Sequence, residues 1–98
     1  MADQETFCAA FPGGISVAIK IDFTILKKSG GSVNCFDTKW EGQPTPQIIP
    51  QYIAWMHTVM SGVAKRVNKP IGYVYPGTRS LKSQNFIYFP DGRYEEME

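Results

Sequence analysis

The side chains of this sequence that could carry chemistry gather in one long stretch without acids. Between Gly42 and Pro90 there is no aspartate or glutamate, although the chain of 98 residues holds nine of them. A local excess of positive charge attracts phosphate, nucleic acid or an acidic protein surface. We therefore take the cations of this stretch as candidates for partner binding. They are Lys65, Arg66, Lys69, Arg79 and Lys82.

A structural explanation competes with this functional one. Lys65, Arg66 and Lys69 fall at or just past the end of a predicted helix, where cations interact favourably with the helix dipole. The formal net charge of the chain is only +1, so no field of the whole molecule favours nucleic acid or a membrane. Taken alone, the residues leave both explanations open.

Aromatic residues interleave with these cations in the last third of the chain. Aromatic rings on a sheet, beside Lys and Arg, can stack unpaired bases. Strand alternation places Tyr73, Tyr75, Phe86 and Tyr88 on one face of a predicted hairpin. Packing in a core or an interface is favoured over base stacking, because one face must be core. Tyr73 and Tyr75 stay among the candidates for partner contact.

The single histidine, His57, and the two cysteines, Cys8 and Cys35, are the candidates for catalysis. His57 falls on the polar face of the predicted helix, where we expect a solvated surface histidine. The predicted strand pairing separates the cysteines by roughly 26 Å, so we expect two free thiols. The chain has no phosphate-binding glycine loop, nucleophile motif or metal-ligand spacing. We therefore expect no catalytic residue, no cofactor and no metal.

The element around which the chain is organised is the stretch 15–26. From Ile15 to Ile25 its odd-numbered residues are all apolar and alternate with small or polar ones, which is typical of a strand with one buried face. A three-residue turn at 12–14 would place residues 6–11 beside this strand. Phe7 then lies opposite Ile19, and the apolar side chains share one face.

A second hairpin is predicted on the other side of this strand. The dipeptide Gly30-Gly31, flanked by polar residues, indicates a type I′ turn that pairs 15–26 with 33–41. This register also avoids like charges directly opposite each other. The predicted pairs are Phe36–Ile25, Thr38–Phe23, Trp40–Ile21, Asp22–Lys39 and Lys20–Glu41.

One helix and a third hairpin complete the prediction. The helix starts at Pro46 or Pro50, with Thr45 as a candidate cap, and ends near Val67 before Asn68. A hairpin over 71–75 and 85–89 follows, with a nine-residue loop at 76–84, and the acidic tail 93–98 is expected to fray. The apolar stripe of the helix comprises Ile49, Ile53, Met56, Met60, Val63 and Val67.

These elements predict an α+β fold in a single domain of residues 1–98. An antiparallel sheet forms in the order strand, strand, strand, helix, strand, strand, with one amphipathic helix packed across one face. No apolar run is long enough to span a membrane and no secretory pattern stands at the start. A cytoplasmic location is the simplest prediction.

The leading hypothesis is a small non-enzymatic binding or regulatory module that acts by protein–protein contact. Its contact surfaces would be the basic helix end, the 76–84 loop and open strand edges. Self-association as a symmetric homodimer is compatible with this hypothesis. One alternative is a single-stranded nucleic-acid-binding protein that uses the basic stretch 65–82 and the sheet aromatics. The other is a small enzyme that uses Cys35 or His57.

Overall fold

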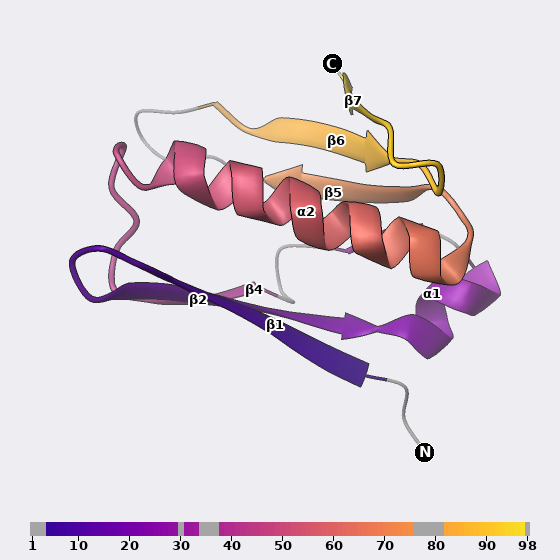
Figure 1. Ribbon diagram of the computed structural model, residues 1–98, viewed down its shortest axis with the longest axis horizontal. Helices are drawn as coiled ribbons and strands as arrows, with labels where there is room; N and C mark the ends of the chain where they lie inside the picture. Colours follow the sequence, from indigo (N-terminus) through magenta and orange to yellow (C-terminus); the bar gives the residue numbers. More distant parts are fainter. Residues whose placement is uncertain (1–3, 30, 34–37, 76–81, 98) are drawn as a thin grey trace.

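The computed structural model describes residues 4–29, 31–33, 38–75 and 82–97. Strands β1 (Gln4–Phe11), β2 (Ile15–Asp22) and β4 (Thr38–Glu41) form one sheet in the order β1-β2-β4. The other sheet has the order β3-β5-β6-β7, in which β3 pairs in parallel and the rest are antiparallel. Its strands are β3 (Gly31–Val33), β5 (Ile71–Tyr75), β6 (Gln84–Tyr88) and β7 (Tyr94–Met97). The short helix α1 (Phe23–Ser29) follows β2, and the long helix α2 (Ile49–Val67) lies between the two sheets (Figure 1).

The predicted α+β class is therefore confirmed, and its strands are divided between two sheets. The predicted β1–β2 hairpin is confirmed in its register, with Phe7 opposite Ile19. Its turn uses Gly13 and Gly14 at φ of 89° and 74°, a backbone region that favours glycine. The odd-numbered residues of β2 are buried, as the alternation predicted.

The stretch 15–26 is not one strand, because β2 ends at Asp22 and helix α1 begins at once. Asp22 Oδ1 accepts hydrogen bonds from the backbone N–H groups of Thr24 and Ile25, at 3.0 and 3.3 Å. This carboxylate satisfies donors that a helix start leaves unpaired. Phe23 and Leu26 are buried and Ile25 is 61% exposed, which is helical spacing and not strand alternation. The strand prediction over 23–26 is wrong.

The second predicted hairpin is also wrong, because α1 separates the two strands that it was meant to join. Gly31 begins β3, which pairs with β5 and not with β2, and Gly30 lies outside the described residues. Strand β4 does pair with β2, but Trp40 lies opposite Val17 and not Ile21. This shift of four residues keeps Trp40 on the predicted face. The predicted pairs Asp22–Lys39 and Lys20–Glu41 fail with it, and Phe36 lies outside the described residues.

Helix α2 follows the predicted stripe. It begins at Ile49 with Pro50 in its first turn, and Thr45 is not its cap, because no side-chain cap bond forms at this end. It ends at Val67, where Asn68 adopts the left-handed conformation at φ of 57°. The stripe is buried except for Ile53, which is half-buried. Neither of the helices in the described ranges is long and apolar enough to cross a membrane.

Tyrosines connect the helix to both sheets in the core. The hydroxyl groups of Tyr52 on α2 and Tyr73 on β5 are 2.7 Å apart, and Tyr73 also bonds Thr38 of β4 at 2.9 Å. The predicted sharing of one face by Tyr73, Tyr75, Phe86 and Tyr88 is confirmed, and that face is core. Tyr73 and Tyr75 are only 1% and 4% exposed, so a partner cannot reach them in this structure.

The acidic tail does not fray as predicted. Residues Tyr94–Met97 form β7, which pairs with β6 and is the edge strand of the second sheet. The turn before it is held by Asp91, whose carboxylate accepts from the backbone N–H of Arg93 at 3.0 Å. Tyr94 stacks on His57 with ring centroids 4.2 Å apart. The packing of the Tyr94 ring against α2 thus orders this segment, although its charges suggested a frayed tail.

Candidate binding site

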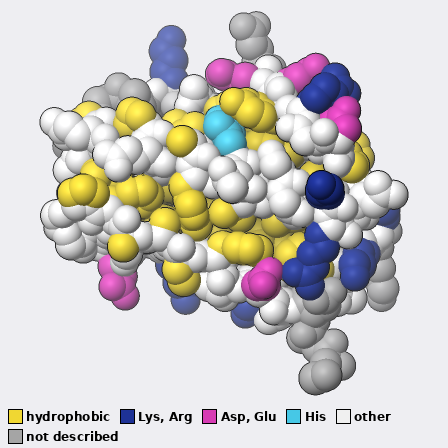
Figure 2. All heavy atoms as spheres, viewed as in Figure 1, with side chains coloured by type: hydrophobic (Ala, Val, Ile, Leu, Met, Phe, Trp, Pro, Cys, Tyr) yellow, Lys and Arg dark blue, Asp and Glu magenta, His cyan; other side chains and the backbone are white. Residues whose placement is uncertain are grey.

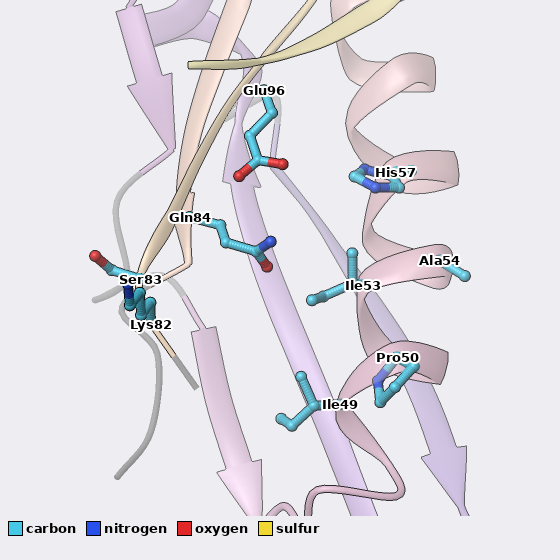
Figure 3. A pocket seen from close by; sticks show the side chains of 9 residues that line it. All are labelled: Ile49, Pro50, Ile53, Ala54, His57, Lys82, Ser83, Gln84 and Glu96. Carbon is cyan, nitrogen blue, oxygen red and sulfur yellow. The ribbon is translucent and has the colours of Figure 1, made fainter. Parts of the chain in front are cut away.

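The cations predicted to form one patch lie at opposite ends of helix α2. Lys65 and Arg66 are in its last turn and Lys69 follows it. Lys82 lines a hollow whose other wall includes Ile49, in the first turn of α2 (Figure 3). A helix of 19 residues is roughly 27 Å long, so the structure separates Lys82 from the three cations at the other end of α2 and does not bring the four into one patch. Arg79 lies outside the described residues.

Two of the cations at the end of α2, Arg66 and Lys69, contact other parts of the chain. Arg66 Nη1 forms an ion pair with Glu5 Oε2 at 3.1 Å, and its guanidinium lies 3.7 Å from the centroid of the Phe23 ring. Lys69 Nζ donates a hydrogen bond to the carbonyl oxygen of Lys27 on α1. These contacts tie β1 and α1 to the helix, and they support the structural explanation of this charge.

An apolar groove runs between β1 and α2. On the face shown in Figure 2, hydrophobic side chains form a band between the helix and the β1–β2 hairpin. The groove contains a hollow of about 310 Å³. A Cβ atom at Gly62 would meet nothing within 4 Å, so the helix wall is open at this point. The hollow is lined by Glu5, Phe7, Phe23, Thr58, Val59, Gly62, Val63 and Arg66.

Strand β1 borders this groove with an edge that no described strand covers. In the ranges that the structure describes, β1 pairs only with β2. Its residues 6–11 contain no charge and no proline, the usual protections of an exposed edge. Phe7, Ala9 and Phe11 are half-buried on the side of the core. The sequence analysis named open edges in general, and the structure shows which edge lies beside an apolar hollow.

A second and larger hollow, of about 640 Å³, lies at the other end of α2 (Figure 3). Lys82, His57 and the half-buried Ile53 are among its lining residues. Glu96 of β7 and Gln84 of β6 line it as well, and the sequence analysis did not find them. Glu96 could have been recognised as a lining residue only if the tail had been predicted to be a strand, because a frayed tail cannot line a hollow.

The candidates for catalysis do not assemble in the described residues. The prediction of a solvated surface histidine is wrong. His57 is half-buried, because Phe86, Tyr88 and Tyr94 surround its ring. Cys8 is a free, exposed thiol on β1 opposite Ala18, as predicted, and Cys35 lies outside the described residues. Within the described ranges, no group of three or more His, Cys, Asp or Glu side chains could hold a metal ion.

Comparison with family models, with curated proteins and with solved structures finds no match to this chain. Two hollows beside α2 are the candidate binding sites of the described chain. The groove combines a strand edge with apolar side chains, which is the arrangement that holds an extended peptide. The larger hollow combines an apolar helix wall with polar groups from the sheet, which is typical of a small-ligand pocket.

Proposed function

We propose that this chain is a binding module that holds an extended segment of a partner protein against strand β1. The observation that carries the proposal is the edge of β1, which lacks charge and proline over residues 6–11 and lies beside the apolar groove of α2. Backbone hydrogen bonds of an added strand give affinity in this mode, and pockets for alternate side chains give specificity. Protein–protein contact through a strand edge was the leading hypothesis from the sequence, and a cytoplasmic location stays a prediction.

The groove suggests what the partner segment looks like. Neighbouring strands place directly opposite residues on the same face, so alternate side chains of an added strand would lie beside Phe7, Ala9 and Phe11. One of these side chains would enter the hollow at Gly62, where α2 leaves space. We therefore expect a segment with apolar residues at every second position. An added strand as long as β1 would span about 26 Å.

The alternative of nucleic-acid binding has less support. Its stacking residues Tyr73 and Tyr75 are core residues, and Lys82 is separated from the cations at the end of α2 by the length of the helix. Catalysis by His57 has no partner group at hydrogen-bond distance except the Tyr88 hydroxyl among the described residues. Neither alternative explains why residues 6–11 of β1 lack protective charge.

The proposal is tested with a displayed library of random 12-residue peptides selected on three forms of the protein. These are the wild type, Gly62→Phe and Gly62→Ala. Both substitutions replace glycine within a helix, where a glycine costs about 1 kcal/mol relative to alanine. Only phenylalanine is large enough to fill the groove. Circular dichroism and thermal unfolding of each variant confirm that the comparison is made between folded proteins.

We expect peptides with alternating apolar residues to be enriched on the wild type and on Gly62→Ala, and to lose at least tenfold in affinity on Gly62→Phe. A ring in the groove would take the space that a partner side chain needs. Failure to enrich any sequence, or equal binding to Gly62→Phe, would show that the groove beside β1 is not the site.

A further inference from the structure

The larger hollow has two chemically different walls (Figure 3). The first turns of α2 form an apolar wall that includes Ile49, Pro50 and Ile53. The opposite wall comes from β7 and from the start of β6, and it is polar. Figure 3 shows the side chains of Gln84 and Glu96 reaching from the sheet into the space in front of Ile53. A ligand here would bury an apolar part against the helix and direct polar groups to the sheet.

The charges of the polar wall have opposite signs and lie apart. Glu96 pairs with Phe86 on β6, and Lys82 precedes Phe86 by four residues. Four residues of extended chain measure about 13 Å, which sets the separation of the two positions along the sheet. Gln84 lies between them and carries both a hydrogen-bond donor and an acceptor, the pair that a peptide group requires.

His57 presents one defined hydrogen-bonding group to the same hollow. Its Nδ1 lies 2.7 Å from the hydroxyl of Tyr88, a side chain that is fully buried. The hydroxyl hydrogen is satisfied only if Nδ1 accepts it, which leaves the imidazole neutral with its hydrogen on Nε2. Burial also lowers the pKa of His57, in agreement with a neutral ring. His57 therefore offers an N–H donor to the hollow that it lines.

We propose that this hollow binds a short apolar peptide with free ends. The ammonium group of the peptide pairs with Glu96 and its carboxylate with Lys82. Its apolar side chain rests on Ile49 and Ile53, and its peptide groups bond Gln84 and the His57 N–H. A peptide of three residues extends to roughly 10 Å, and the side chains of Glu96 and Lys82 would span the rest of the roughly 13 Å between their positions. This site is independent of the groove beside β1.

Isothermal titration calorimetry with the tripeptide Ala-Leu-Ala tests the proposal. Three forms of the peptide are compared, which are the free, the N-acetylated and the C-amidated one. They are titrated into the wild type and into Glu96→Gln and Lys82→Gln, two substitutions of exposed side chains. Glu95→Gln is the matched control, because Glu95 pairs with Ile87 on the opposite face of β7.

We expect the free peptide to bind the wild type and each cap to weaken it about tenfold, the usual size of one charge-assisted hydrogen bond. Acetylation should have no effect on binding to Glu96→Gln, and amidation should have none on binding to Lys82→Gln. Gly62→Phe should bind the tripeptide unchanged, which separates this site from the groove. Absence of binding at millimolar peptide, insensitivity to both caps, or equal weakening by Glu95→Gln would overturn the proposal.

Discussion

The hydroxyl of Tyr88 lies 2.7 Å from Nδ1 of His57, which joins β6 to α2 beneath the last strand. Tyr94 of β7 stacks on the other side of the imidazole, and the edge of Phe86 contacts it. A protonated ring could not accept the Tyr88 hydrogen. Burial lowers the pKa of His57 below its ordinary value of 6.5. The fold therefore favours the neutral imidazole.

This relationship predicts how stability depends on pH. At His57 the unfolded chain binds a proton more readily than the folded one. The contribution of the neutral His57 to the free energy of unfolding is therefore fully present above about pH 6.5, and it is lost as the pH falls through the lowered pKa of the folded state. Urea unfolding at pH 7.5 and pH 5.5 should show a larger loss of stability in the wild type than in His57→Gln. Equal losses in the two proteins would show that His57 is not the responsible group.

Two core tyrosines should respond in opposite ways when their hydroxyl groups are removed. The hydroxyl of Tyr75 is buried and finds no hydrogen-bond partner among the described residues, whereas that of Tyr73 bonds Tyr52 and Thr38. Tyr73→Phe should lower the free energy of unfolding by about 1–2 kcal/mol. Tyr75→Phe should leave it unchanged or raise it by up to about 1 kcal/mol. Urea unfolding at neutral pH measures both, and an equal loss would reveal a partner for Tyr75.

Binding of single-stranded nucleic acid should be weak and should not involve Lys82. The cations at the end of α2 are Lys65, Arg66 and Lys69. Three phosphate contacts give a slope of log K against log salt of about −2 for a single strand, and we expect no steeper slope. Fluorescence anisotropy of a labelled oligonucleotide measures this slope, and Lys82→Glu should leave it unchanged. A steeper slope that Lys82→Glu reduces would mean that the two ends of α2 do act as one surface.

Local patterns were sufficient to predict several elements. The alternation in β2 and the Pro-Gly-Gly turn before it predicted the first hairpin and its register. The 4-3-4-3-4 spacing from Ile49 to Val67 predicted α2, and Asn68 predicted its end. In each case the neighbours that decide the structure lie within a few positions in sequence, so the pattern contains the information.

The errors arose where distant contacts decide. Ile21, Phe23 and Ile25 continue the alternation of a strand, but the Asp22 carboxylate caps a helix at this point. After Asp22, Phe23 and Leu26 pack into the core and Ile25 is exposed. The charges of residues 94–97 suggested a solvated tail. The contact that orders this segment, the stacking of Tyr94 on His57, joins positions far apart in sequence and is not visible in the local pattern. The walls of both hollows come from such contacts, and no local spacing predicts them.

The central claim is that β1 accepts an added strand, and amide hydrogen exchange of β1 tests it most directly. In the free protein, the alternate N–H groups of residues 6–11 that point away from β2 should exchange quickly. A peptide selected on the wild type should slow these amides, and the same peptide should not slow them in Gly62→Phe. If a bound peptide leaves every amide of β1 unchanged, binding occurs elsewhere on the molecule and strand addition at β1 is contradicted.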